Sequence, residues 1–237
     1  MMNPRIYVIG FNNQKHVDRA LGSIPAKYQR ILLDNGSIAL KAPDGVEHYA
    51  IGPGMFTSAF NWALRDAMEH GAIPVVCNDD IAFEDGCIEL LVKAIENGAG
   101  LACPVQVDMN LPNNIIMGGT VQCFPAGIHR TGIRGRHHTK NCDYPWLPFC
   151  VTAVNPETIR QVGYPDDQLK MWFSDSDYSI RVRAAGFTVM LIADAFVRHE
   201  QSSAINAARS DKLDRQMALD RMCFERKYGG QILEECK

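Results

Sequence analysis

Short apolar runs alternate with amphipathic stretches over residues 1–105, and this alternation restricts the fold more than any other feature. The apolar runs lie at residues 6–9, 30–33, 73–77 and 101–105, with a weaker one at 47–51. Apolar residues at 56, 60, 64 and 68 recur every four positions until Gly71, which is a helical period. Alternation of this kind is typical of a parallel sheet covered by helices on both faces. The sequence therefore predicts an α/β fold with a mostly parallel central sheet.

The second part of the chain follows a less regular pattern. We expect strands over residues 115–124 and 187–192, helices over 175–185 and 210–228, and an irregular segment over 125–148. No linker, repeat or low-complexity segment is present, and 237 residues suit one α/β domain. We therefore treat residues 1–237 as a single domain with two halves, 1–105 and 106–237, and with a helix near its C-terminal end.

Charge and composition exclude several classes of protein. With a hydrophobic content of 46% the chain is typical of a globular protein rather than a disordered one. The net charge is −3, so a nucleic-acid partner would need a local basic patch. Residues 129–140 offer one, since they contain Arg130, Arg134, Arg136, Lys140 and three histidines but no acid. This segment suits a solvated loop, a clamp on a diphosphate or a contact with a nucleic-acid backbone.

The eight cysteines do not form a zinc-binding pattern, because no C-x-x-C pair occurs and no His/Cys cluster has zinc-finger spacing. Cys77, Cys103 and Cys123 lie in apolar runs, where a free cysteine behaves as a small hydrophobic residue. The N-terminal apolar run is too short for a signal peptide, and no stretch is long enough to span a membrane. We expect a reduced, soluble, cytoplasmic protein; the sequence does not predict its oligomeric state.

Polar clusters follow three of the predicted strands: Asn12-Asn13, Asp34-Asn35 and Asn78-Asp79-Asp80. Ligands of parallel sheets bind beyond the carboxyl ends of the strands, so we expect these clusters to converge on one edge of the sheet. Carboxylates there suit a divalent cation that also binds a nucleotide diphosphate. The alternative is that the clusters form turns and cap the helices that follow.

The second half contributes further polar candidates. Ser174-Asp175-Ser176-Asp177 precedes a predicted helix, and its two carboxylates point to different sides. One acid can cap the helix while the other faces a cleft and accepts a proton from an attacking hydroxyl. His199 could be a further metal ligand if it lies near Asp80, or else a structural residue.

In order along the chain, six segments resemble family-two glycosyltransferases of GT-A fold, and the resemblance covers nearly the whole chain. They are IYVIGFNN with RILLDNGS, GPGMFTSAFNWAL, VVCNDDI, WFSDSDYSIRVRAAGF, ADAFVRHE and FERKYGG. VVCNDDI is similar to the D-x-D strand, although Asn78 replaces the first acid. WFSDSDYSIRVRAAGF is similar to the block that carries the catalytic acid, although Ser174 stands where the family has Glu.

This resemblance implies a division of labour between the halves. Residues 1–105 would bind the nucleotide sugar and residues 106–237 would contribute the acceptor and catalytic side. Asp80 and His199 would hold Mn²⁺ or Mg²⁺, and Asp175 would be the general base. Donor contacts would come from Asn12, Asp34 (to the base), Asn35, Asn61, Asn78 and Asp79. Candidates for the acceptor side are Trp146, Trp172, Arg130, Arg134, Arg136 and Asp177, with core packing the alternative for both tryptophans.

The implied reaction is an inverting, divalent-metal-dependent transfer from a nucleotide-diphosphate sugar, such as a UDP-sugar, to an acceptor hydroxyl. The acceptor could be a saccharide, a protein or small molecule, or a hydroxymethylated base in DNA, which would make this a DNA-modifying enzyme. Two alternatives remain open: a nucleotidyltransferase with the same layout, and a non-catalytic nucleotide-sugar-binding module. Replacing Asp175 by Asn separates catalysis from binding.

Overall fold

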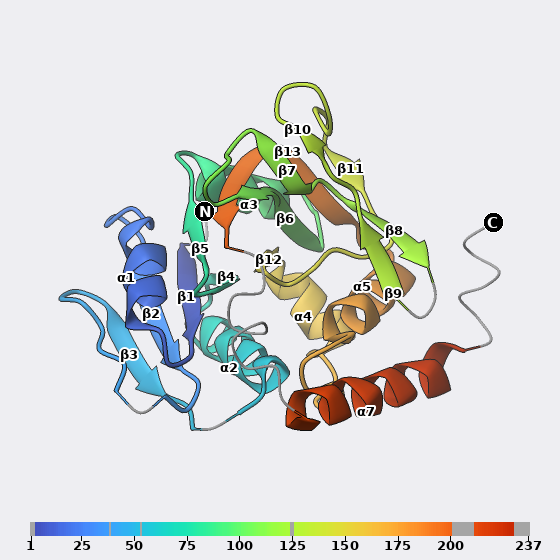
Figure 1. Cartoon of the computed structure of the whole chain (residues 1–237), viewed down its shortest axis with the longest axis horizontal. Helices are drawn as coiled ribbons and strands as arrows, with labels where there is room; N and C mark the ends of the chain where they lie inside the picture. Colours follow the sequence, from blue (N-terminus) through green and yellow to red (C-terminus); the bar gives the residue numbers. More distant parts are fainter. Residues whose placement is uncertain (1–2, 38, 53, 124–125, 201–210, 230–237) are drawn as a thin grey trace.

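The computed structural model (Figure 1) describes residues 3–37, 39–52, 54–123, 126–200 and 211–229. Its described helices are α1 (Gln14–Gly22), α2 (Phe56–Glu69), α3 (Cys87–Glu96), α4 (Pro156–Val162), α5 (Ser174–Ala184) and α7 (Asp211–Tyr228). Its strands are β1 (Pro4–Gly10), β2 (Gln29–Asp34), β3 (Glu47–Ala50), β4 (Ile73–Asn78), β5 (Ile81–Phe83), β6 (Leu101–Asp108), β7 (Asn114–Met117), β8 (Thr120–Cys123), β9 (Ala126–His129), β10 (Gly132–Ile133), β11 (Cys142–Asp143), β12 (Val151–Val154) and β13 (Val189–His199).

One mixed sheet runs through both halves of the chain. Strands β3, β2, β1 and β4 lie side by side and are parallel. Strand β12 comes next and runs antiparallel to both β4 and β6, between which it lies. Strand β13 pairs in parallel along β6, and its C-terminal end also pairs with β5. The predicted α/β class with a largely parallel central sheet is confirmed, and strands 151–154 and 189–199 bring the second half into the sheet of the first.

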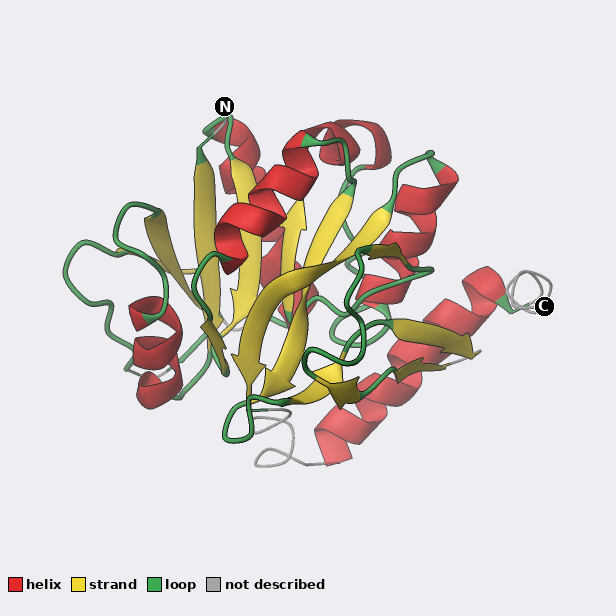
Figure 2. Ribbon diagram, turned by 90° about the horizontal axis from the view of Figure 1, so that it is seen from above, coloured by secondary structure: helices red, strands yellow, loops and turns green. Residues whose placement is uncertain are grey.

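Helices cover both faces of this sheet (Figure 2). The pleat of β1 sends Ile6 and Val8 into one core and Tyr7 and Ile9 into the other, as expected for a strand buried on both sides. The first core contains apolar side chains of α1 and α3, and the second contains those of α2, α4 and α5. The apolar period predicted over residues 56–68 therefore faces the sheet as α2, with Phe60 and Leu64 fully buried.

The second half differs from the prediction in several places. The strand expected over residues 115–124 is divided into β7 and β8, because Gly119 has a φ of 116° and packs where a side chain would collide with the Tyr144 ring. The segment expected to be irregular contains the short strands β9, β10 and β11. The strand expected over 187–192 continues to His199, with a register shift after Ile192. Neither β12 nor α4 was predicted.

The C-terminal helix α7 packs against a small core of its own. Leu169, Cys223 and Phe224 are buried there, with Phe173 and Tyr228 packed around them. This cluster joins α7 to the loop before α5 and to α5 itself (Figure 1). The predicted C-terminal helix is confirmed. Within the described part of the chain, no helix has both the length and the apolar character that crossing a bilayer requires.

Candidate active site

The polar clusters that follow β1, β2 and β4 meet at one edge of the sheet. Strand pairing aligns Gly10 with Asp34 and Ile9 with Asn78, so the carboxyl ends of all three strands lie together. The backbone N–H of Phe11 donates to Asp79 Oδ2 over 3.1 Å. The predicted convergence of these clusters therefore exists in the folded chain.

The first two clusters are also linked through their own loops. The N–H of Asn12, a residue with a positive φ of 54°, donates to Ser37 Oγ (2.8 Å), and the N–H of Ser37 donates to Asp34 Oδ1 (2.7 Å). Asn35 Oδ1 accepts from the N–H of Gly54 (3.1 Å), in the segment that leads into α2. Asp34 and Asn35 thus shape the turns around them, as the alternative interpretation of these residues predicted, and they lie at the edge formed by the ends of β1, β2 and β4.

Asn61 has a different position from the other predicted donor contacts. It is buried in α2, and its Nδ2 donates to the carbonyl of Pro165 (2.9 Å) and to Asp167 Oδ1 (2.8 Å). These bonds attach α2 to the loop between α4 and α5. The structure does not bring the Asn61 amide to the edge formed by β1, β2 and β4, because its hydrogen bonds direct it toward that loop.

The third cluster connects β4 to β13. Asp80 is buried, and its Oδ1 lies 3.4 Å from His199 Nε2, at the C-terminal end of β13. The N–H of Glu200 donates to the carbonyl of Asp80 over 2.9 Å. The N–H of Asn78 donates to the carbonyl of Cys150, just before β12. The fold thus brings Asp80 and His199 together from segments far apart in the sequence.

A glutamine on β6 orients the imidazole of His199. Gln106 is buried, and its Oε1 lies 2.8 Å from His199 Nδ1. Because an amide oxygen can only accept, this contact assigns the hydrogen to Nδ1 and turns Nε2 toward Asp80. Hydrogen bonding of this kind to the second ring nitrogen is the usual support for a metal-binding histidine.

The charges of Asp80 and His199 support each other. Burial by itself would raise the pKa of Asp80, but hydrogen bonding to His199 and the nearby imidazoles hold that pKa below its ordinary value. Burial also opposes a charge on His199, but the neighbouring Cys150 and Asp80 outweigh it and raise its pKa to about 10. Asp80 is therefore ionised at neutral pH, and a cation that binds His199 displaces a proton.

These two side chains fit a divalent cation that is shared with a phosphate. Asp80 Oδ1 is buried and, apart from its contact with His199 Nε2, has no hydrogen-bond partner within the described residues, so this oxygen could bind a cation. Among the same residues, no group of three His, Cys, Asp or Glu side chains is placed to hold a metal ion. Mg²⁺ and Mn²⁺ accept such a site, because Mg²⁺ in particular takes one or two carboxylates and completes its coordination with substrate phosphates and water.

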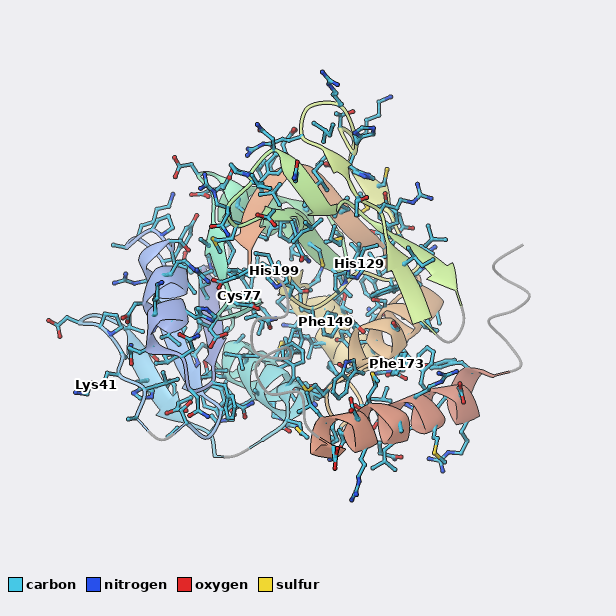
Figure 3. The ribbon with its side chains drawn as sticks, viewed as in Figure 1. Lys41, Cys77, His129, Phe149, Phe173 and His199 are labelled. Carbon is cyan, nitrogen blue, oxygen red and sulfur yellow. The ribbon has the colours of Figure 1, made fainter. Side chains whose placement is uncertain are left out.

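Asp175 lies in the first turn of α5, next to the same region. Its Oδ1 accepts from the N–H of Ser176 (2.8 Å), and its carboxylate also interacts with the backbone N–H of Phe149. Cys150, the next residue, contacts His199. Figure 3 labels Phe149 and His199, which both lie in the middle of that view. The two residues just before β12, Phe149 and Cys150, therefore connect Asp175 to the pair formed by Asp80 and His199.

The environment of Asp175 suits proton transfer. Desolvation of the carboxyl raises its pKa to about 6, although its hydrogen bonds to backbone N–H groups act in the opposite direction. A carboxylate with a pKa near the working pH is ionised at pH 7 and still binds a proton well enough to act as a general base. Asp79 has a pKa of about 7, also because of burial, but its carboxylate is engaged with the β1 loop.

Two tryptophans were predicted on the acceptor side, and they differ in exposure. Trp146 is buried, and its ring centroid lies 5.9 Å from that of His129. Its Nε1 is buried without a hydrogen-bond partner in the described part of the chain. Burial and the proximity of His199 lower the pKa of His129. Trp172 is half-buried in the loop before α5. Trp146 thus lies next to His129, whose pKa is lowered in part by His199.

The basic segment 129–140 does not act as one uniform patch. Arg134 Nη1 bonds to Glu84 (2.8 Å), and its guanidinium lies 3.8 Å from the Phe196 ring centroid. Arg134 lines an open pocket with Arg19 and Arg198, where Glu84 balances part of the charge. Arg130 is exposed and lies over the Tyr144 ring, and Arg136 is exposed. The local positive charge is therefore smaller than the sequence suggested.

Asp177, also predicted on the acceptor side, is an internal structural residue. It is completely buried, and its carboxylate accepts from Arg181 Nε (3.0 Å), Lys227 Nζ (2.9 Å) and the Tyr228 hydroxyl (2.8 Å). The last two residues belong to α7. Residues two apart on a helix point in different directions, so Asp175 lies on another side of α5, while Asp177 joins α5 to α7 and its carboxylate is not available to an acceptor.

Two contributors were not predicted: Gln106 and the Phe149 backbone amide. Gln106 carried a signal, since it is a polar residue inside the otherwise apolar run LACPVQV. No sequence signal could identify the amide of Phe149, because every residue except proline has a backbone N–H.

The sequence matches no protein-family profile and no curated protein. The structure, in contrast, is similar to solved glycosyltransferases. For GalNAc-T7 with UDP, GalNAc and Mn²⁺, the TM-score is 0.69 at 14% identity, over 84% of this chain and 44% of that one. For S. aureus TarS 1–349, the TM-score is 0.57 at 12% identity, over 96% of this chain and 72% of that one. For S. aureus TarS, the TM-score is 0.56 at 12% identity, over 87% of this chain and 38% of that one. This chain thus spans less than half of the GalNAc-T7 chain. The α/β architecture is a GT-A-like glycosyltransferase scaffold, as the fold prediction stated.

Proposed function

We propose that this chain is an inverting, divalent-metal-dependent glycosyltransferase that moves a sugar from a nucleotide-diphosphate donor to an acceptor hydroxyl. The observation that carries the proposal is the approach of Asp80 Oδ1 to His199 Nε2 (3.4 Å) beside the edge where the polar strand ends converge. A scaffold similar to that of GalNAc-T7, whose crystal structure contains UDP, GalNAc and Mn²⁺, supports a UDP-sugar as donor.

In this proposal Asp80 and His199 would hold the cation, and Gln106 fixes the imidazole of His199 in the orientation that binds the cation. When bound, Mn²⁺ or Mg²⁺ offsets negative charge on the leaving diphosphate. The turns formed by Asp34 and Asn35 lie at the same edge and offer carbonyl and carboxylate oxygens to the ribose and base. The Asp79 carboxylate keeps the β1 loop in place through Phe11 N–H.

Asp175 accepts the proton of the acceptor hydroxyl. Its carboxylate is held by the backbone N–H groups of Ser176 and Phe149, so one orientation is favoured before the acceptor binds. The acceptor oxygen then attacks the anomeric carbon from the face opposite the leaving diphosphate, which inverts the configuration. The proton moves to Asp175 as the new glycosidic bond forms and the bond to the diphosphate breaks.

The test measures donor binding and turnover separately. Thermal shifts with UDP-GalNAc, UDP-glucose, GDP-mannose and dTDP-glucose, each with and without Mn²⁺, identify the donor, since a ligand at 100 times its Kd adds about 2.7 kcal/mol of stability. Hydrolysis of the donor, in which water takes the place of the acceptor, then gives a turnover rate as release of nucleoside diphosphate. No shift and no release with any donor would refute the proposal.

Variants assign the roles. Asp80→Asn should lose the Mn²⁺-dependent shift, whereas Asp175→Asn should keep the shift and lose turnover. Asp44→Asn, at an exposed position, is the matched control and should retain both. If Asp175→Asn keeps full turnover, Asp175 is not the base.

The two alternative functions predict different products. A nucleotidyltransferase would release pyrophosphate from a nucleoside triphosphate in the presence of a sugar phosphate. A non-catalytic module would give the thermal shift without any turnover of the wild-type chain. The similarity of the scaffold to glycosyltransferases supports sugar transfer over both. The acceptor stays open between a saccharide, another small molecule or protein, and a hydroxymethylated base in DNA.

A further inference from the structure

The helix α7 contacts the loop that precedes α5 through one acidic side chain. Asp220 is completely buried. Its Oδ1 accepts from the backbone N–H of Lys170 (3.1 Å), and its Oδ2 accepts from those of Met171 (2.8 Å) and Trp172 (2.9 Å). Gln216 Nε2 adds a fourth hydrogen bond (2.7 Å). Three consecutive backbone amides that point at one carboxylate impose a definite curvature on the chain, as anion-binding nests do.

The opposite edge of the same loop is held by α2. The N–H of Thr57 donates to the carbonyl of Lys170 (3.1 Å), and its hydroxyl donates to the carbonyl of Leu169 (2.5 Å). Thr57 is buried in the first turn of α2. The loop is therefore bonded through its amides to α7 and through its carbonyls to α2, which leaves its backbone little freedom.

The loop leads directly into the helix that carries Asp175. Phe173, the last residue before α5, has a φ of 64°, which a residue with a side chain adopts only when its surroundings hold it there. Its ring stacks on Phe224 of α7, with 5.2 Å between centroids. No side chain caps this end of α5, and the helix begins with the bond from Asp177 N–H to the carbonyl of Phe173 (2.8 Å).

We propose that Asp220 is a positioning residue for Asp175. By binding the amides of residues 170–172, Asp220 fixes the point at which α5 begins and so sets the position of the Asp175 carboxylate in the first turn of that helix. Asp220 acts through the backbone alone and contacts neither donor nor acceptor. The inference rests on the proposed function, because it assigns Asp175 the part of the base. Errors of about 1 Å in the position of a catalytic group can cost about a hundredfold in rate.

The test compares Asp220→Asn with Tyr228→Phe. Asparagine keeps the shape of Asp220 but replaces one carboxylate oxygen, an acceptor, by an amide NH2 group, a donor that would face backbone N–H donors. Tyr228→Phe also removes a polar contact of α7, the bond to Asp177 Oδ1 (2.8 Å), but keeps the ring of Tyr228 and removes no hydrogen bond of residues 170–173. With the donor of highest turnover and Mn²⁺, we expect Asp220→Asn to lower kcat at least tenfold with the donor KM within twofold. Tyr228→Phe should keep kcat within twofold.

Hydrogen exchange measures the position of the loop without relying on turnover. In Asp220→Asn, amides in the peptide 170–177 should exchange at least tenfold faster than in the wild type. The apparent pKa of the acid limb in the pH profile of kcat should also differ from that of the wild type. In Tyr228→Phe the exchange of residues 170–173 should be unchanged. Should Asp220→Asn fail to fold, Thr57→Val removes the hydroxyl bond on the other edge and should lower kcat at least threefold.

The outcomes separate the two proposals. If Asp175→Asn loses turnover while Asp220→Asn keeps kcat within twofold and the exchange of residues 170–177 is unchanged, Asp220 does not position the base and this inference is wrong. If Asp175→Asn keeps full turnover, the proposed general base itself is wrong. Equal losses of kcat in Asp220→Asn and Tyr228→Phe would show a general effect of α7 on stability, which also overturns the inference.

Discussion

The pH dependence of turnover gives a direct test of the part assigned to Asp175. Desolvation raises the pKa of this carboxyl to about 6, and only the ionised form accepts a proton from the acceptor. The ionised fraction is then about 0.9 at pH 7 and about 0.1 at pH 5, so kcat should fall about tenfold between these two values. With an ordinary aspartate pKa of about 4, the same change would lower kcat by only about 10%.

The assay follows release of nucleoside diphosphate from pH 4.5 to 8 with saturating donor and Mn²⁺, so that kcat reports the bound complex. The Kd of Mn²⁺ is measured at pH 5 and pH 7 to confirm that the site stays filled. Asp175→Asn should lower kcat by about 10²–10⁴-fold and abolish the acid limb. Asp79→Asn is the control for the other carboxyl whose pKa is raised, and it should keep the acid limb of kcat near pH 6.

Two results would refute the reasoning. One is a kcat that is flat between pH 5 and 7 while Mn²⁺ remains bound. The other is an acid limb that persists unchanged in Asp175→Asn or disappears in Asp79→Asn. Either result would mean that the group titrating near pH 6 is not the Asp175 carboxyl.

Three further predictions concern the metal site, the core and the acceptor. Gln106→Leu should weaken Mn²⁺ binding about 10–100-fold in calorimetry, because the Nδ1–H of His199 loses its acceptor; an unchanged Kd would remove Gln106 from the site. Asp66→Ala should cost about 1–3 kcal/mol in urea unfolding, because the Tyr7 hydroxyl and the buried Arg5 guanidinium lose an acceptor, although Arg5 keeps its bond to Glu47; an unchanged stability would contradict this. A DNA acceptor requires salt-sensitive binding of duplex DNA that weakens on alanine substitution of Arg130, Arg134 and Arg136, and binding that is absent or unaffected would exclude it.

The fold class was predictable because local hydrophobic patterns define the elements. The run at residues 6–9 and the four-residue period of α2 are properties of neighbouring side chains, and both appear in the structure as predicted. Strands β12 and β13 show where this reasoning fails. Strand β12 is only four residues long, and β13 is interrupted by a register shift. Their pairing with β4 and β6 depends on contacts with distant segments.

The candidate site was predictable to the extent that it lies at strand ends. Asp34 ends β2 and Asp79 follows β4, and the carboxyl ends of parallel strands lie at the same edge of a sheet. The roles of two acids in one motif could not be separated in advance. Asp175 and Asp177 belong to the same turn, and only the packing of α7 against α5 decides that Asp177 is internal.

The sequence by itself determined that this chain forms an α/β sheet whose strands end in polar clusters, because hydrophobic period and turn chemistry act between near neighbours. The tertiary structure decided which of those polar groups meet. Asp80 approaches His199 because β13 runs along β6 to the end of β4, and Asp220 reaches the loop before α5 because α7 folds back onto it. Such contacts depend on strand order and helix orientation, which arise from the packing of the whole chain.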